Sequence, residues 1–476
     1  MNRRRRTKIV ATLGPATSSP DMIVALMEAG VDLFRLNFSH GTRDVHKRNI
    51  DLIRQESDKL GIPVGVLQDL QGPKIRVLTF EEGKIALTVG DNFNLTCNDD
   101  SPGDSTRVGV SYKNLYNDVK IGDTLLLDDG RLALRVTGLK DETIQTDVTL
   151  GGVLSNNKGI NIPNADLSIP ALTDKDVEDL LFGAELDVDW VAISFVRSRD
   201  DLLLARHYLA RAGSRAKLMA KIEKPSAVAR FDEILQEVDG VMVARGDLGV
   251  EMPPERVPII QKRLIRASLE AGKPVVTATQ MLESMISSPT PTRAESSDVA
   301  NAIFDGTDAV MLSAETAVGA FPIEAVRMMD RIACSVESDP GYQQGMREHY
   351  PKPEDTTADA VSLGACEMAF TLSAGVIVTF TSSGTTAMRV SRNRPSAPIL
   401  AITPNERAYR QMSVVWGVFP VMSEEIHNTD EMVDVAAQII ARTGIAPEGS
   451  RFVITAGVPF GMRGTTNLIR IERVRS

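Results

Sequence analysis

Short apolar segments that alternate with helical segments are the feature that most restricts what this chain can fold into. Eight strands are predicted, at about residues 7–13, 31–36, 63–67, 190–193, 217–220, 240–243, 274–277 and 308–312. Helices such as 20–30, 42–60, 254–271 and 296–304 separate them. Because such alternation forms right-handed parallel units, eight units predict a (β/α)₈ barrel. The active site of such a barrel lies at the C-terminal ends of its strands.

Two parts of the chain depart from the alternation. Residues 71–170 contain short β-prone runs separated by Gly, Asp and Asn, which predicts a small all-β domain inserted into the barrel. Segment 339–354 is rich in Pro and Gly and is expected to be a linker. The predicted class is therefore α/β: a barrel from residues 1–70 and 171–345, the insertion at 71–170, and an open-sheet α/β domain at 355–476.

Composition excludes several classes of function. Hydrophobic residues make up 43% of the 476 residues and charged residues 24%, as in soluble globular proteins. The net charge of −10 argues against general binding to nucleic acid or anionic membranes. The basic run at 3–6 precedes no apolar segment long enough for a signal peptide, and no stretch approaches the length of a membrane span. Three scattered cysteines fit a reducing compartment, so we expect a cytoplasmic protein.

Charged side chains close two neighbouring strands. In the run 217–225, alternation sends Lys221 and Glu223 to the same face of a strand. The next strand ends in Arg245-Gly246-Asp247, where glycine allows a close backbone approach to a ligand. Two carboxylates and an ammonium at adjacent strand ends suit a divalent cation and an anionic substrate. Either segment alone is equally well explained by salt bridges at the surface.

Most of the other predicted strands also end in polar residues. These residues are Arg35, Asn37, Ser39, His40, Asp69, Ser194, Thr279, Ser313 and Glu315. Polar groups at the same end of so many strands predict a single anion-and-metal site. His40 is interpreted as a structural hydrogen-bonding residue. Since no Walker-type loop and no Cys/His cluster are present, a phosphate in this site would be neutralised by a metal ion and fixed cations.

Five motifs at these strand ends resemble the pyruvate kinase family. They are Arg35-Leu-Asn-Phe-Ser-His-Gly41, Lys221-Ile-Glu223, Ala244-Arg-Gly-Asp-Leu-Gly-Val-Glu251, Thr279-Gln-Met-Leu-Glu-Ser-Met285 and Met311-Leu-Ser-Ala-Glu-Thr316. The resemblance extends along essentially the whole chain. It implies transfer of the phosphoryl group of phosphoenolpyruvate to ADP, giving ATP and pyruvate. It also implies a homotetramer and an inserted domain that closes as a lid.

The resemblance assigns roles residue by residue. Arg35 would bind the phosphoryl group, with Lys221 on the transfer path and Thr279 and Ser313 in the region that protonates the enolate. Ala244, Gly246 and Asp247 would contact the substrate, and Glu223 and Asp247 would hold Mg²⁺ or Mn²⁺. Arg76 and Lys158 match positions that contact the phosphates of the nucleotide.

The monovalent-cation positions of the family are Asn37, Ser39 and Asp69 here. The chain departs from the family beside them, because Lys74 and Leu70 stand where the common pattern has Glu and Thr. A lysine removes a negative charge and adds a repelling one, so K⁺ is expected not to be required. The alternative is that Lys74 points towards the lid and helps to hold nucleotide phosphate. Lys224 also replaces the usual Asn.

The C-terminal domain contains a predicted effector loop. Thr381, Ser382, Ser383, Gly384, Thr385 and Thr386 follow an apolar strand and precede a helix, and hydroxyls with helix N-terminal N–H groups can cradle a phosphate. The loop matches the family's effector loop, and the turn 457–464 could close over the same ligand. Activation by a sugar phosphate or AMP is expected; the alternative is an ordinary strand-to-helix turn.

Two other functions are compatible with parts of this pattern. One is a Mg²⁺-dependent aldolase or phosphomutase acting on pyruvate or phosphoenolpyruvate, which would need no nucleotide-binding cations. The other is a non-catalytic regulatory subunit that senses metabolites. The intact set Lys221, Glu223, Asp247 and Thr279 argues against the second.

Overall fold

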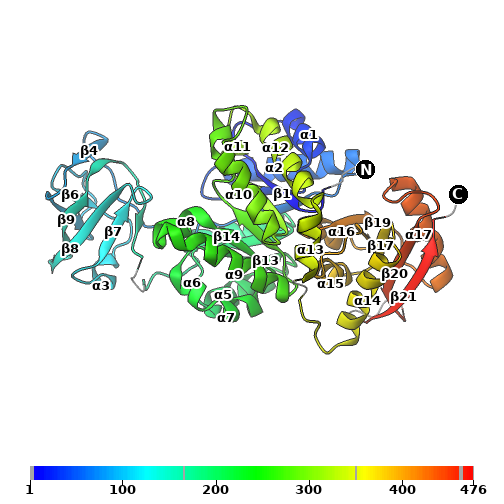
Figure 1. The fold of residues 1–476 in the computed structure, drawn as a ribbon. Helices are drawn as coiled ribbons and strands as arrows, with labels where there is room; N and C mark the ends of the chain where they lie inside the picture. The colour runs from blue at the N-terminus through cyan, green and yellow to red at the C-terminus, as the bar shows by residue number, and fades with distance from the viewer. Residues whose placement is uncertain (1–4, 164–166, 349–350, 460–464, 475–476) are drawn as a thin grey trace.

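The computed structural model describes residues 5–163, 167–348, 351–459 and 465–474. Three bodies follow one another in space, with the barrel between the inserted β domain and the C-terminal domain (Figure 1). No helix in these ranges combines the length and the hydropathy needed to cross a membrane.

The barrel is closed by eight parallel strands, which confirms the predicted fold class. In chain order they are β1 (Lys8–Thr12), β2 (Leu33–Asn37), β3 (Gly65–Asp69), β12 (Trp190–Ile193), β13 (Lys217–Ile222), β14 (Gly240–Ala244), β15 (Val275–Ala278) and β16 (Ala309–Leu312). Each strand pairs with its neighbour in chain order, and β16 pairs with β1 to close the barrel. All eight are buried along nearly their whole length, which is why they are continuous apolar runs in the sequence.

Helices surround these strands. They are α1 (Pro20–Ala29), α2 (Arg43–Leu60), α4 (Asp174–Glu185), α5 (Arg199–Arg211), α6 (Pro225–Ala229), α7 (Phe231–Glu237), α8 (Arg245–Glu251), α9 (Val257–Glu270), α10 (Arg293–Phe304), α11 (Ala314–Ala317) and α12 (Pro322–Glu337). Short 3₁₀ turns lie at Pro254–Arg256 and Glu283–Ile286. As the sequence predicts, α1 begins with Ser19 as its N-cap and Pro20 in the first turn, and Gly30 ends it at φ +125°.

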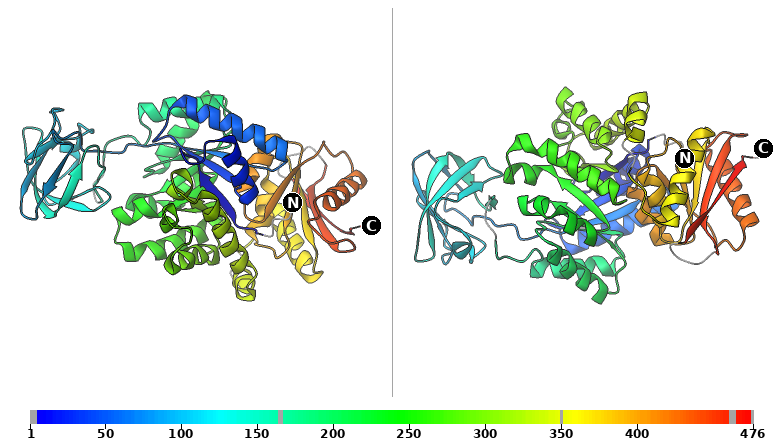
Figure 2. Two further views of the ribbon diagram at one scale, coloured as in Figure 1. Left: turned by 90° about the horizontal axis from the view of Figure 1, so that it is seen from above. Right: turned by 60° about the horizontal axis from the view of Figure 1, so that its bottom comes forward.

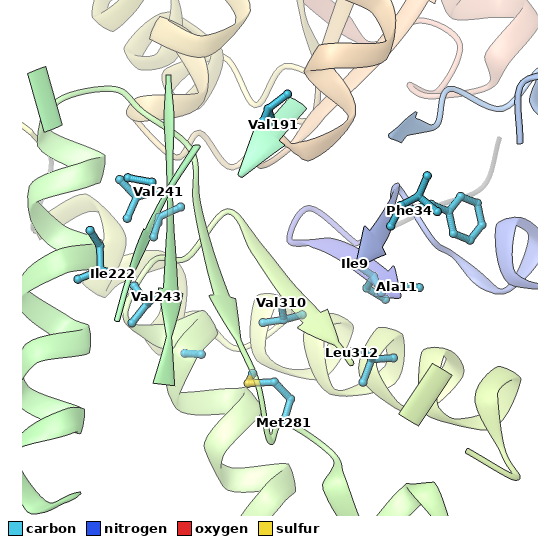
Figure 3. Packing of buried hydrophobic residues seen from close by; sticks show 14 of the residues in the cluster. Ile9, Ala11, Phe34, Val191, Ile222, Val241, Val243, Met281, Val310 and Leu312 are labelled. Carbon is cyan, nitrogen blue, oxygen red and sulfur yellow. The ribbon is translucent and has the colours of Figure 1, made fainter. Parts of the chain in front are cut away.

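The barrel core consists of apolar side chains, many of them Ile, Val and Leu, between the strands and this helical ring. Figure 3 shows Ile9, Ala11, Phe34, Val241 and Val243 among them. Each of these five side chains is fully buried. Such a densely packed barrel is a rigid support for side chains that project from the strand ends.

The inserted domain leaves the barrel after β3 and returns before α4. Its strands are β4 (Lys84–Leu87), β5 (Asn92–Thr96), β6 (Arg107–Gly109), β7 (Thr124–Leu127), β8 (Leu132–Lys140), β9 (Thr143–Leu150), β10 (Gly152–Ser155) and β11 (Ile160–Asn161). They form a six-stranded sheet in the order β11-β7-β8-β9-β5-β6 and a pair β10-β4. One short helix, α3 (Leu115–Asp118), lies among them. The domain has its own apolar core around Phe93, Leu125 and Leu134.

The segment that joins the barrel to the last domain is not a simple linker. The expectation of an irregular segment over 339–354 is wrong for its first half, because α13 (Pro340–Glu348) is helical. Pro340 and Gly341 lie in the first turn of α13, where a proline costs no hydrogen bond, so these residues indicated a helix start rather than a loop. Tyr342 of α13 is buried, and its ring lies edge-on to Phe304 with the centroids 5.8 Å apart.

The C-terminal domain is an open sheet of five strands in the order β19-β18-β17-β20-β21. The strands are β17 (Val376–Phe380), β18 (Ile399–Thr403), β19 (Val418–Met422), β20 (Arg451–Gly457) and β21 (Thr466–Arg473), of which only β21 is antiparallel. The helices are α14 (Thr357–Thr371), α15 (Thr385–Arg392), α16 (Glu406–Gln411) and α17 (Thr429–Thr443), with a 3₁₀ turn at Met412–Val414. Figure 2 shows this sheet on the side of the barrel away from the inserted domain.

Buried polar contacts fix the C-terminal domain to the barrel. Arg394 pairs with Asp308, with Nη2 and Oδ2 3.0 Å apart, and Arg410 Nε lies 2.8 Å from Asp189 Oδ1. Trp190 Nε1 donates to the backbone oxygen of Gln411 at 3.2 Å. Asp189 and Asp308 immediately precede β12 and β16. The C-terminal domain therefore covers the N-terminal ends of the strands, opposite the end at which the inserted domain leaves the barrel.

Candidate active site

Three charged side chains from β2, β3 and β13 meet at the C-terminal end of the barrel. Asp69, at the end of β3, is 1% exposed and lies between Arg35 of β2 and Lys221 of β13. Its Oδ2 is 2.6 Å from Arg35 Nε, and its Oδ1 is 3.3 Å from Lys221 Nζ. Arg35 also donates to Thr12 Oγ1 at 3.1 Å. Asp69 thus holds both cations that sequence analysis assigned to the phosphoryl group.

Lys221 and Glu223 share one face of the chain at the end of β13, as their spacing predicts. Lys221 Nζ lies 2.9 Å from Glu223 Oε1 and donates to Ser194 Oγ at 2.7 Å. Glu223 Oε2 accepts a 2.7 Å hydrogen bond from the backbone N–H of Phe195. Phe195 has φ +54°, a conformation that is unfavourable for a large side chain. This local strain coincides with the contact that orients Glu223.

Burial and charge act against each other in this cluster. Burial alone would raise the pKa of Asp69, but the charges of Lys221 and Arg35 outweigh it and lower that pKa. Burial lowers the pKa of Lys221, and the facing Asp69 and Glu223 more than reverse this effect. Burial raises the pKa of Glu223; Lys221 opposes the shift and Asp247 adds to it. Lys221 therefore stays charged, whereas the positive charge around Glu223 is too small to offset the burial of its carboxylate.

The loop after β14 forms the adjoining wall. Asp247 and Gly246 lie in the first turn of α8, which begins directly after Ala244. The N–H of Gly246 donates to Thr279 Oγ1 at 2.7 Å, and a Cβ on Gly246 would lie 3.2 Å from that oxygen. Thr279 follows β15 with φ +70°. Arg245 braces the same turn, because its Nη2 donates to the backbone oxygen of Thr279 at 2.8 Å while its Nη1 lies 2.6 Å from Asp298 Oδ1.

Ser313 lies at the end of β16, where the buried Glu315 holds the turn. Glu315 Oε2 accepts from the N–H of Ser313 at 2.7 Å, and its Oε1 accepts from the N–H of Leu282 at 3.1 Å. The hydroxyl of Ser313 is buried and has no hydrogen-bond partner among the described residues. Glu315 therefore ties the ends of β15 and β16 together, a role that sequence analysis did not give it.

The carboxylates of Glu223 and Asp247 fit a divalent cation of the Mg²⁺ type. They are close enough for Asp247 to raise the pKa of Glu223. Glu223 Oε1 is buried and accepts no hydrogen bond within the described ranges, so its only neutralising contact is the ion pair with Lys221. No group of three or more His, Cys, Asp or Glu side chains among the described residues is arranged to hold a metal ion. Such a site suits Mg²⁺, which takes one or two carboxylates and completes its shell with substrate oxygens and water.

The positions assigned to a monovalent cation are only partly together. Asn37 and Asp69 occupy paired positions on β2 and β3, and Asn37 Oδ1 accepts from the N–H of Ser39 at 3.1 Å. Lys74 lies at the connection to the inserted domain, where a Cβ on Gly159 would be 3.1 Å from its Cε. In the described part of the chain no hydrogen bond or ion pair joins Lys74 to Asn37, Ser39 or Asp69.

Arg76 and Lys158 lie close together at this same connection. Arg76 Nη1 donates to the backbone oxygen of Asn157 at 2.8 Å, and Lys158 Nζ pairs with Asp128 at 2.8 Å. Both cations therefore make these contacts within the inserted domain and not with the barrel site. Bringing them to a ligand held at the strand ends would require that domain to move relative to the barrel.

A second buried ion pair at this connection was not predicted. Lys224 Nζ lies 2.5 Å from Glu251 Oε1, and the same oxygen accepts from Asn161 Nδ2 at 2.8 Å. Glu251 is the last residue of α8, whereas Asn161 belongs to β11 of the inserted domain. Only the replacement of the usual Asn by Lys224 marked this region in the sequence.

In the predicted loop 381–386, residues 381–384 connect β17 to α15, and Thr385 and Thr386 are the first residues of that helix. Gly384 has φ +84°, and its N–H donates to Thr381 Oγ1 at 2.9 Å. The hydroxyls of Ser383 and Thr385 are 2.9 Å apart, as are those of Thr386 and Thr466. Much of the companion turn 457–464, at 460–464, lies outside the described residues.

The fold and the site together define a class of protein: a barrel enzyme that handles an anionic, phosphorylated substrate with fixed cations and paired carboxylates. Comparison with known proteins gives the family. Residues 4–326 match the family model "Pyruvate kinase, barrel domain", and residues 359–472 match "Pyruvate kinase, alpha/beta domain".

Individual members of this family align with the chain over nearly its full length. The chain is 49% identical to a pyruvate kinase of Agrobacterium vitis, over 98% of both chains. It is 42% identical to one of Clostridium acetobutylicum, over 99% of this chain and all of the other. A crystal structure of a pyruvate kinase from Cryptosporidium parvum matches with a TM-score of 0.93 at 35% identity, over 99% of this chain and 96% of the other. The chain belongs to the pyruvate kinase family and is a phosphotransferase whose substrates are phosphoenolpyruvate and ADP.

Proposed function

We propose that the cluster at the strand ends carries out phosphoryl transfer from phosphoenolpyruvate to ADP. Arg35 binds the phosphoryl group, and Lys221 offsets charge on its oxygens while it moves. The observation that carries this proposal is the anchoring of both cations by Asp69, which fixes two positive charges beside one strand end. A coupled assay for ATP formed from phosphoenolpyruvate and ADP tests it. An aldolase or phosphomutase would turn over its substrates without ADP.

The substrate is proposed to lie against the backbone of Ala244 and Gly246. The close approach of Gly246 to Thr279 supports this, because an added Cβ would lie 3.2 Å from Thr279 Oγ1 and glycine permits a close backbone approach to a ligand. Thr279 and Ser313 lie at the ends of β15 and β16, and we assign them to protonation of the enolate once the phosphoryl group has left. The test is solvent-deuterium exchange into pyruvate, which a Thr279→Val enzyme should perform more slowly than wild type.

Glu223 and Asp247 are proposed to hold Mg²⁺ or Mn²⁺. When bound, the metal supplies positive charge to the oxygens of the substrate. The raised pKa of Glu223 supports this assignment, since a buried carboxylate with too little positive charge is an incomplete site. Titration of Mn²⁺ into the free enzyme tests it, because Glu223→Gln should weaken binding in the absence of any turnover.

Arg76 and Lys158 are proposed to contact the phosphates of the nucleotide when the inserted domain closes. Their proximity at the domain connection supports this proposal. Replacing either by Gln should raise the KM for ADP and leave the KM for phosphoenolpyruvate nearly unchanged. A change in the KM for phosphoenolpyruvate alone would contradict it.

We propose that K⁺ is not required. Asp69, the charged member of the cation positions, is already paired with two cations, and Lys74 adds positive charge near the domain connection. Initial rates with and without KCl, at constant ionic strength in tetramethylammonium buffer, test this. A flat response should become K⁺-dependent in Lys74→Glu but not in the exposed control Lys84→Glu. A large rise in the wild-type rate with K⁺ would refute the proposal.

The loop 381–386 is proposed to bind the phosphate of an activating sugar phosphate or AMP. The exposed Ser382, the half-buried Ser383 and the N-terminal N–H groups of α15 support this. The triple variant Thr381→Ala, Ser382→Ala, Ser383→Ala should abolish activation and spare the basal rate. Because Thr381 also holds Gly384, the double variant Ser382→Ala, Ser383→Ala separates loss of ligand contacts from loss of loop structure. Unchanged activation in both variants would exclude the loop.

The assembly and location are also proposals. By membership of the family we propose a homotetramer in the cytoplasm, with neither nucleic acid nor membrane as a partner. The negative net charge argues against a nucleic-acid partner, and three scattered cysteines are typical of a reducing compartment. Light scattering at several protein concentrations measures the assembly, and a mass of one chain would contradict it.

A further inference from the structure

Ser194 directly follows β12 but has no role in the phosphoryl transfer proposed above. Only 1% of this residue is exposed. Strand β12 pairs with β3 on one side and with β13 on the other, so its end lies between the strand ends that carry Asp69 and Lys221. Ser194 is thus placed among the charged side chains of the candidate active site, although it carries no charge itself.

The hydroxyl of Ser194 connects the two neighbouring strand ends. It accepts a hydrogen bond from Lys221 Nζ at 2.7 Å and donates one to the backbone oxygen of Leu70 at 2.7 Å. Because a hydroxyl has a single hydrogen, the bond to Leu70 fixes its rotation and turns its lone pairs towards Lys221. Leu70 is itself held, since its N–H donates to the backbone oxygen of Ala192 at 3.1 Å. The acceptor that faces Lys221 is therefore fixed by the backbone of two strands.

This hydrogen bond gives Lys221 a direction that its ion pairs do not give. Nζ lies 3.3 Å from Asp69 Oδ1 and 2.9 Å from Glu223 Oε1, but within the described ranges these two buried oxygens accept no hydrogen bond. Coulombic attraction depends on distance, whereas a hydrogen bond also favours one line between donor and acceptor. Without Ser194, the two carboxylates alone would decide where the ammonium lies.

Ser194 has little freedom to move. The backbone of Gly72 packs directly against it, because a Cβ on Gly72 would lie 2.9 Å from Ser194 Cβ. The next residue, Phe195, is held by the 2.7 Å hydrogen bond from its N–H to Glu223 Oε2. The turn after β12 therefore contacts Lys221 through one residue and Glu223 through the next. A functional side chain that must be placed precisely needs such a rigid support.

We propose that Ser194 is a positioning residue for phosphoryl transfer, which keeps the ammonium of Lys221 from moving onto Glu223. This inference rests on the functions proposed above for Lys221 and Glu223. With the hydroxyl present, one N–H of Lys221 is committed to Ser194, and Glu223 Oε1 stays available to a divalent cation. Without the hydroxyl, that N–H turns to the nearest carboxylate. Lys221 then leaves the transfer path and competes with the cation for Glu223.

Two independent measurements on Ser194→Ala test the proposal. In the coupled assay at saturating Mg²⁺, kcat should fall about 10²-fold because the transfer charge is misplaced, and the KM for phosphoenolpyruvate should stay nearly unchanged. Titration of Mn²⁺ into the free enzyme, where no turnover occurs, should show several-fold weaker binding than in wild type. Ser194→Cys keeps the shape of the side chain but is only a weak acceptor, so it should show the same two changes if Ser194→Ala folds poorly.

Two further variants separate positioning from general stability. Ser268 of α9 is also a fully buried serine, and its hydroxyl donates to the backbone oxygen of Leu264 at 2.8 Å. The matched control Ser268→Ala should therefore leave both kcat and the affinity for Mn²⁺ unchanged. In a Lys221→Met background, Ser194→Ala should no longer weaken Mn²⁺ binding, because the competing ammonium is absent.

Three results would overturn the proposal. The first is a Ser194→Ala enzyme with the kcat and the Mn²⁺ affinity of wild type. The second is weaker Mn²⁺ binding that persists in the Lys221→Met background, since the hydroxyl would then act without the lysine. The third is a loss of stability in denaturant unfolding without either change, which would leave Ser194 only as the partner of Leu70. A wild-type enzyme that forms no ATP would instead refute the proposed function, and the Mn²⁺ titrations would still decide whether Ser194 holds Lys221 away from Glu223.

Discussion

Replacement of Lys221 by Met is the perturbation that the site geometry defines most sharply. The change keeps the length of the side chain and removes its charge. Lys221 Nζ lies 2.9 Å from Glu223 Oε1 and 3.3 Å from Asp69 Oδ1, so two buried carboxylates lose a shared cation. The same substitution removes the charge proposed to lie on the path of the phosphoryl group.

The expected losses of stability and of turnover can each be given a magnitude. With an effective dielectric constant of 20, the two attractions amount to about 6 and about 5 kcal/mol. Most of this is offset by the cost of burying the charges, and removing one partner of a buried ion pair typically destabilises a protein by about 3–5 kcal/mol. Loss of a fixed charge that acts in the transition state costs roughly 10²–10³-fold in kcat. Both stability and turnover should therefore fall in Lys221→Met.

A double-mutant cycle distinguishes catalysis from structure. Asp69→Asn removes one of the two carboxylates left unpaired, so the double variant Lys221→Met, Asp69→Asn should be more stable than the sum of the single effects, by about 1–3 kcal/mol. Turnover should not recover with it. Denaturant unfolding gives the free energies, and the coupled assay under saturating substrates gives kcat.

Mn²⁺ binding to the free enzyme provides the remaining control. Lys221 pairs with Glu223, so its removal should leave the affinity for Mn²⁺ unchanged or higher. If the double variant regained turnover along with stability, the role of Lys221 would be structural. Near-native turnover in Lys221→Met would refute the assignment outright.

Two further predictions concern buried groups outside the cluster. Glu251→Gln breaks the ion pair with Lys224 and weakens the contact with Asn161 of the inserted domain, so the KM for ADP should rise several-fold. In the same assay, the exposed control Glu255→Gln should leave the KM for ADP unchanged. Burial lowers the pKa of His46 from its usual 6.5, so the unfolded chain binds the proton more readily and stability falls as the pH drops below that value. His46→Gln should therefore flatten this part of the pH dependence of the urea midpoint. An unchanged profile would assign the pH dependence to other groups.

The architecture was predictable because each strand of a parallel barrel is buried on both faces and therefore stands out as an apolar run. The same logic proposed the site in the barrel, since its candidates lie at or just after the C-terminal ends of the strands. The segment after α12 was misinterpreted because Pro340 and Gly341 are compatible with both a loop and the first turn of a helix. The helix α13 is stabilised by tertiary packing of Tyr342 against Phe304, which local sequence does not reveal.

There is a different reason why the sequence did not predict which charged side chains pair within the site. Strand order places Asp69 next to Asn37, which fits its assignment to a monovalent-cation position, yet its side chain is shared between Arg35 and Lys221. A buried carboxylate pairs with the cations that remain nearest after all neighbouring side chains are packed, and that outcome depends on several strands at once. Asp69 therefore positions the cations proposed to act on the phosphoryl group, whatever monovalent ion the enzyme uses. Any dependence of activity on Asp69 must consequently be separated from K⁺ binding, by measuring Asp69→Asn in the presence and in the absence of K⁺.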